Sequence, residues 1–149
     1  MQSLSLDTLP GLVGKTLGPS EWVRVTQDRI NQFAEATGDK QWIHVDVEKA
    51  ATGPFGKTVA HGLLTLSMIG VMGKDVFKFE GFKMGVNYGY EKIRFPTPVP
   101  VDSNLRVRVQ IVSFDLIGAV WQTVVEFTVE VEGAAKPACV AQMIFRHTP

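Results

Sequence analysis

The chain has 149 residues, and its 15 Lys and Arg equal its 15 Asp and Glu, so the formal net charge is zero. With 45% hydrophobic and 20% charged residues it has the composition of a folded protein with an ordinary core, and its length corresponds to a single domain, residues 1–149. The balanced charge, without a basic stripe, argues against nucleic acid and against an anionic membrane surface as partners.

The N-terminal part of the chain predicts an irregular arm, a short strand and one amphipathic helix. Residues 1–20 are rich in Gly, Pro and Ser, and residues 21–25 follow as a strand candidate. Thr26 is a typical N-cap, and Gly38 stands where the end of a helix needs a left-handed residue. Apolar or small side chains recur between them at helical spacing: Ile30, Phe33, Ala34 and Thr37.

Two more helical segments follow. Residues 47–51 form a short fragment before the turn cluster at 53–56. Residues 61–73 are apolar all round apart from Thr65 and Ser67. Because a helix that is apolar on every side must be surrounded by protein, we expect this one at the centre of the fold.

The second half of the chain predicts antiparallel strands. Residues 85–95 read as a strand in which Gly89 indicates a bulge. Apolar and polar residues then alternate in three segments joined by two turns: residues 105–111, 121–131 and 139–145, with turns at 115–118 and 133–137.

Only a sheet that curls around the apolar helix covers it on most sides. The pattern therefore predicts an α+β hot-dog domain, an antiparallel sheet wrapped around one long apolar helix. A helix packed flat on a sheet within a dimer would give much the same pattern.

Asp39 and His44 are the first candidates for chemistry. They are five residues apart, so they converge only across a turn, which Gly38 can supply. A carboxylate and an imidazole on one small loop can hold and deprotonate a water near neutral pH. Alternatively, Asp39 hydrogen-bonds local amides in an Asx-turn and His44 is a satisfied core residue.

The second candidate is Ala60-His61-Gly62, directly before the apolar helix. Free N–H groups at a helix start bind negative charge, and a glycine lets a substrate oxygen approach closely, so Gly62 is a candidate oxyanion hole. Alternatively, Gly62 only relieves crowding and His61 only caps the helix.

At this point the sequence resembles the MaoC-like hot-dog dehydratases, which include the (R)-specific enoyl-CoA hydratases. The resemblance covers residues 20–145 and rests on ordered blocks: Gly38-Asp39-x-x-x-Ile43-His44-x-Asp46, Phe55-Gly56, Ala60-His61-Gly62 and Arg94-Phe95-x-x-Pro98-Val99. It implies that Asp39 and His44 are the catalytic pair and that the Gly62 N–H binds the thioester oxygen. We also expect substrate-binding roles for His61, Trp42 and Phe55.

The implied reaction is the addition of water to a trans-2-enoyl-CoA, giving the (3R)-3-hydroxyacyl thioester. Because a single hot-dog unit of this size leaves an edge strand and part of its helix cover incomplete, we expect a homodimer. Neither a cofactor beyond the substrate's own CoA nor a metal is expected, since the three histidines lack metal-ligand spacing. The alternatives are a hot-dog thioesterase, a non-catalytic acyl-thioester-binding module, or one partner of a heterodimer.

The sequence departs from the family pattern in two places. Gln41-Trp42 stands where members commonly have Asn-Pro, and Gly70 replaces a frequent serine. Both changes predict a modified substrate fit rather than lost chemistry.

The remaining candidates have plainer interpretations. Cys139 shares its strand face with apolar residues and is expected to be a buried, inert thiol, whereas His147 is expected to be solvated. A single cysteine and the absence of a signal-like N-terminus lead us to expect a cytoplasmic protein. Four basic residues could meet the CoA phosphates: Lys57, Lys83, Lys92 and Arg94.

Overall fold

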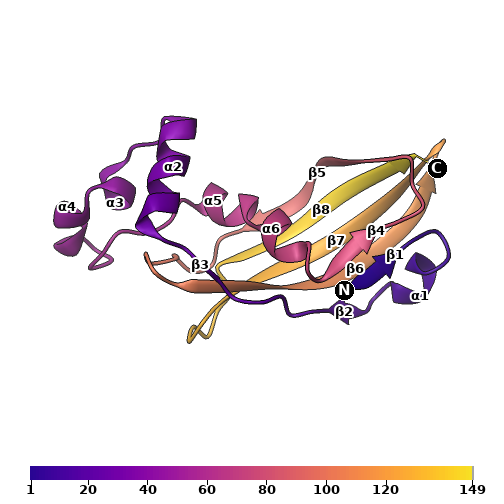
Figure 1. The fold of residues 1–149 in the computed structure, drawn as a ribbon, viewed down its shortest axis with the longest axis horizontal. Helices are drawn as coiled ribbons and strands as arrows, with labels where there is room; N and C mark the ends of the chain where they lie inside the picture. Colours follow the sequence, from indigo (N-terminus) through magenta and orange to yellow (C-terminus); the bar gives the residue numbers. More distant parts are fainter. Residues whose placement is uncertain (149) are drawn as a thin grey trace.

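The computed structural model describes residues 1–148, which form an antiparallel sheet curled around two short helices (Figure 1). In chain order the elements are β1 (Gln2–Leu4), α1 (Leu9–Leu12), β2 (Thr16–Leu17), β3 (Val23–Arg24), α2 (Gln27–Thr37), α3 (Trp42–Val45), α4 (Val47–Ala51), α5 (Gly62–Ser67), α6 (Ile69–Gly73), β4 (Phe77–Phe79), β5 (Met84–Arg94), β6 (Asn104–Ile117), β7 (Val120–Val131) and β8 (Cys139–Thr148).

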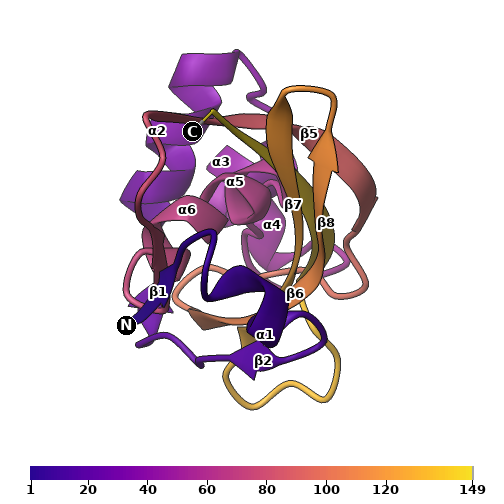
Figure 2. The same ribbon diagram turned by 90° about the vertical axis from the view of Figure 1, so that its right-hand side faces the viewer.

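The main sheet has the strand order β2-β6-β7-β8-β5, with β3 also paired to β6, and all its pairings are antiparallel. On β6, every second residue from Leu105 to Ile111 is fully buried, as the alternation of apolar and polar residues predicts. Figure 2 shows α5 and α6 on the concave side of this sheet. The predicted α+β arrangement is therefore confirmed.

The central helix differs from the prediction of one long element. It is divided at Met68 into α5 and α6. The Ser67 hydroxyl donates to the Leu63 carbonyl at 2.7 Å, a back-bond that tends to bend helices, and Gly70 has a low helix propensity. Nor is it covered on every side, because Leu63 and Val71 are 60% and 50% exposed in a single chain.

The N-terminal arm is more ordered than predicted. β1 pairs in parallel with β4, and β2 pairs with β6, so residues 1–20 are not simply irregular. Leu4 and Leu9 are fully buried and belong to the core. Burial of these two leucines removes apolar surface from water and thereby holds the arm on the domain.

The bulge predicted in β5 is present, whereas the turn predicted at 115–118 is displaced. β5 carries register shifts on both sides of Gly89–Tyr90, which confirms the predicted irregularity there. The turn expected at 115–118 lies further along, because pairing continues to Ile117 opposite Val120. The hairpin closes through Gly118, whose φ of 62° favours glycine.

His147 contradicts its predicted solvation. It is 1% exposed and lies on the inner face of β8 under Phe79 and Phe82. The segment 79–82 that covers it is far away in sequence, so the alternation of β8 alone could not reveal this burial. No helix of residues 1–148 is long and apolar enough to cross a membrane.

Candidate functional site

The C-terminal cap of α2 positions Asp39. The Thr26 hydroxyl accepts the Arg29 N–H at the start of this helix, as predicted for an N-cap. At its end Gly38 adopts a φ of 78° and donates its N–H to the Ala34 carbonyl at 2.8 Å. This left-handed cap turns the chain sharply, so that Asp39 leaves the helix direction and can approach the next segment.

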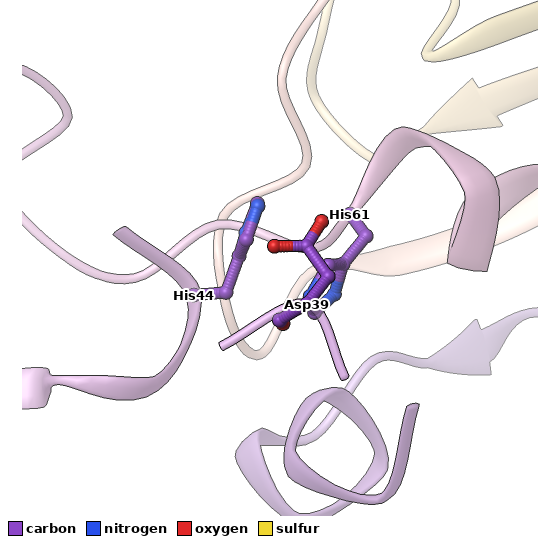
Figure 3. A group of neighbouring side chains, drawn as sticks. All are labelled: Asp39, His44 and His61. Atoms are coloured by element: carbon purple, nitrogen blue, oxygen red, sulfur yellow. The ribbon is translucent and has the colours of Figure 1, made fainter. Parts of the chain in front are cut away.

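Three side chains meet beyond this turn: Asp39, His44 on α3, and His61 directly before α5 (Figure 3). One potential ligand atom from each lies within 4.8 Å of the others. The two imidazoles stack with ring centroids 3.8 Å apart and an interplanar angle of 26°. The structure thus brings Asp39 and His44 together as the spacing predicts, and it adds His61 to the group.

The hydrogen bonds fix the tautomer of His44. Its Nδ1 lies 2.6 Å from the Val59 carbonyl oxygen. Because a carbonyl only accepts, Nδ1 carries the proton in the neutral ring and Nε2 keeps its lone pair. The buried ring therefore offers a proton acceptor at Nε2.

His61 is held in the opposite sense. Its Nε2 lies 2.9 Å from the backbone carbonyl of Asp39, so this nitrogen donates and Nδ1 has the lone pair. The ring is 3% exposed and also contacts Phe33, with centroids 4.9 Å apart. This single side chain therefore ties the Asp39 turn to the start of α5 and supports the face of His44.

The Asx-turn alternative for Asp39 receives weak support. The Gln41 N–H donates to its Oδ1 over 3.4 Å, a long and therefore weak bond. The residue is exposed, unlike both histidines. Most of the hydrogen-bonding capacity of the carboxylate is thus left for a ligand or a water.

Gln27 and Thr58 support the site and were missed by the sequence analysis. The Gln27 amide donates to the His44 backbone carbonyl at 2.8 Å and accepts the hydroxyl of buried Thr58 at 2.5 Å. These bonds connect α2, α3 and the segment before α5. No local motif signals them, because each joins residues far apart in the chain.

Gly62 is the first residue of α5, so its N–H has no acceptor within the helix. It lines a cavity of about 140 Å³ together with Asp39, His44 and His61. On its other side it lines a second cavity, of about 250 Å³, with Phe55 and Phe95. A Cβ at this position would lie 3.3 Å from the exposed Phe95 ring, which would have to shift by a few tenths of an ångström to admit it.

Two other candidates lie away from this cluster. Trp42 packs against Gly53, where a Cβ would lie 2.9 Å from the indole, and under Lys49, so it does not line the cavities beside Gly62. A contact between Trp42 and the substrate stays a prediction. Cys139 is fully buried, and burial raises the pKa of its thiol to about 11, as an inert thiol requires.

The same three side chains are the residues that could hold a metal ion. Sequence spacing gave no hint of this grouping, because His61 enters from a distant segment. However, the rings stack nearly parallel, so their in-plane lone pairs do not converge well, and Nε2 of His61 is already used by Asp39. The geometry suits holding a water and moving a proton better than coordinating a metal.

A further cavity lies along the helices. This helix-side cavity has about 490 Å³ and is lined on one side by α5 and α6, from Leu66 to Lys74, and on the other by strands β4, β5, β7 and β8. Its sheet side is mainly aromatic and includes Phe79, Phe127 and Phe145. Such a surface suits an apolar chain.

Comparison with known proteins gives a consistent result. Residues 9–135 match the family model for the MaoC like domain. The 3-hydroxyacyl-thioester dehydratase Z of Mycobacterium tuberculosis is 48% identical over 144 residues, which are 96% of this chain and 95% of that protein.

Solved structures of other proteins share the fold. The monoamine oxidase regulatory protein of Archaeoglobus fulgius has a TM-score of 0.79 at 20% identity and covers 100% of this chain and 99% of its own. The (R)-hydratase of A. caviae involved in PHA biosynthesis has a TM-score of 0.72 at 20% identity, covering 92% and 96%. The fold is the hot-dog fold, and the chain belongs to the MaoC-like domain family.

Proposed function

We propose that this protein is a hydratase/dehydratase that interconverts a trans-2-enoyl thioester and the (3R)-3-hydroxyacyl thioester, with CoA as the carrier. The observation that carries the proposal is the placement of the His44 Nε2 lone pair and the Asp39 carboxylate in one cavity with Gly62. The relative of 48% identity is a 3-hydroxyacyl-thioester dehydratase, which supports the same substrate class.

In hydration, a water held by Asp39 and His44 gives its proton to His44 Nε2 while its oxygen bonds to C3. Charge moves to the thioester oxygen, where the free Gly62 N–H stabilises it. The imidazolium, stabilised by the nearby Asp39 carboxylate, then returns the proton to C2. One water thus supplies both the hydroxyl and the C2 proton, and no cofactor is needed.

Because both additions pass through a single water on one face of the enoyl group, we expect syn addition. Gly62 selects the face by holding the carbonyl. The (3R) configuration follows from the family resemblance rather than from the geometry of the cluster. The helix-side cavity is the proposed site of the acyl chain, since it follows directly along α5 and α6 from Gly62.

We also propose that the protein acts as a homodimer in the cytoplasm. β5 is an edge strand, and its side chains Met84, Val86 and Tyr88 are 58%, 43% and 58% exposed. An unprotected edge of this length favours pairing with another chain. A second copy would also cover the exposed Leu63 and Val71.

The deciding experiment is an assay of the purified protein with crotonyl-CoA. We expect the enoyl thioester absorbance to fall without release of free thiol, and chiral analysis to give the 3R product. Thiol release at the same rate would favour the thioesterase instead. No turnover by the homodimer would favour a binding module or a heterodimer partner, and a 3S product would refute the proposed face.

A further inference from the structure

His147 is a buried histidine that the proposed chemistry does not use. Its ring stacks on Phe82, with centroids 4.4 Å apart, and lies 4.2 Å from Phe79. Neither ring nitrogen has a hydrogen-bond partner among residues 1–148. Since a neutral imidazole has one N–H donor and one lone pair, both are left unpaired in an aromatic surrounding, which is unfavourable without a partner.

His147 is among the residues that line a cavity of about 340 Å³ at the end of β8. Neither ring nitrogen has accessible surface, so a ligand reaches them only when the ring turns toward this cavity. Three of its lining residues, Phe79, Asn87 and Phe145, also line the helix-side cavity. The two cavities are therefore neighbours that share one wall. In Figure 1 the C-terminal end of β8 lies at the opposite end of the sheet from α2 and α3.

The helix-side cavity occupies part of this distance. It is lined from Leu66, one turn after Gly62, to Lys74 at the end of α6. At the rise of an α-helix, the path from Gly62 to Lys74 is at most about 18 Å, because the division at Met68 can only shorten it. An extended chain covers this length with roughly fifteen carbon–carbon bonds, judged from the reach of an extended backbone.

We propose that His147 recognises a hydroxyl group at the far end of a long acyl chain, so that the substrates include long-chain acyl thioesters hydroxylated at or near the terminal carbon. This inference rests on the proposed function, since it assumes that the thioester lies at Gly62. A hydroxyl both donates and accepts, so it can pair with either tautomer of the ring.

The alternative of a terminal carboxylate is less favourable. Burial lowers the pKa of His147 below its usual value, so the ring is neutral and gives an anion no opposite charge. Lys83 also lines the cavity but is exposed, where a carboxylate paired with it would stay hydrated.

Binding of saturated ligands tests the inference separately from turnover, because they lack the double bond that reacts. We would measure by calorimetry the Kd of hexadecanoyl-CoA, its 16-hydroxy derivative and its 16-carboxy derivative, and repeat the series at 12 and 14 carbons. For one chain length or more, the hydroxylated ligand should bind about tenfold more tightly than the plain one, the value of one net hydrogen bond.

In His147→Phe that preference should fall to about one, because a phenyl ring keeps the packing and removes both nitrogens. His147→Leu serves the same purpose if the larger ring prevents folding. Cys139→Ala is the matched control, since it changes a buried residue on the same face of the same strand, and it should keep the preference.

The inference is overturned if the wild type binds plain and hydroxylated ligands equally at all three lengths, if the carboxylated ligand binds most tightly, or if the preference persists without His147. Failure of the proposed function gives a different result, namely no hydration of crotonyl-CoA by the wild type. The binding comparison stands in either case.

Discussion

Replacement of His44 by Asn and by Gln separates its chemical role from its structural one. The amide nitrogen of Asn can occupy the place of Nδ1 and keep the hydrogen bond to the Val59 carbonyl, which is 2.6 Å in the wild type. The Asn side chain has no atom at the place of the His44 Nε2. The amide of Gln reaches toward the place of Nε2 and abandons Val59.

The expected magnitudes follow from these contacts. His44→Asn loses the general base and should slow hydration roughly 10²–10⁴-fold, which is about 2.7–5.5 kcal/mol of barrier. Its stability should fall by about 0.5–1.5 kcal/mol, because the stack with His61 is lost. His44→Gln should lose about 1–3 kcal/mol more, since the buried Val59 carbonyl becomes unpaired.

Crotonyl-CoA hydration gives the rate, and urea unfolding gives the free energy of unfolding for each variant. The two measurements should not change in proportion: the Asn variant should be the more stable of the two while being severely impaired. Wild-type turnover in His44→Asn would show that Nε2 is not the base. An Asn variant less stable than the Gln variant would refute the inferred tautomer.

Three further outcomes follow from the same contacts. Asp39→Asn should slow hydration roughly 10²–10⁴-fold. Its urea midpoint should stay nearly unchanged, because this carboxylate is exposed and makes one long hydrogen bond. Unchanged kcat/KM would remove Asp39 from the mechanism. Gly62→Ala should fold, since the Phe95 ring 3.3 Å from the new methyl is 44% exposed and can shift. Its kcat/KM should fall roughly 100-fold, because the methyl displaces the thioester by about 1 Å. Wild-type kinetics in this variant would argue against the oxyanion role of Gly62. Burial lowers the pKa of His147 in the folded state, so the unfolded chain binds more protons there. The free energy of unfolding should therefore decrease as the pH falls below about 6.5, by at most about 1.4 kcal/mol per pH unit. His147→Leu should remove this component, and an identical pH profile would show that folding does not lower the pKa of this ring.

The parts of the fold that local chemistry determines could be predicted from the sequence. Thr26 and Gly38 bound α2 because a hydroxyl cap and a left-handed glycine act within a few residues of the helix ends. The long strands follow from alternation, which records one buried face directly. Asp39 and His44 belong to this class too, since a single short turn brings them together.

Features that depend on distant pairing could not be predicted in this way. β1 is held by β4, and His147 is covered by the segment around Phe79. Both partners are distant in the sequence, so the residues next to β1 and to His147 give no sign of them. The tautomer of His44 depends on the Val59 carbonyl, a backbone group present at every residue. The sequence contains no signal that distinguishes this carbonyl from any other.

The departure from the family pattern at Gln41-Trp42 can now be interpreted physically. Trp42 packs against Gly53 and Lys49 on the outside of α3, whereas His44 is held through its ring by Val59 and through its backbone by Gln27. These two sets of contacts involve different partners, so the indole can change how α3 is supported without changing the direction of His44 Nε2. The position of the base therefore depends on main-chain and amide hydrogen bonds, which explains how a large aromatic residue is tolerated two positions before it.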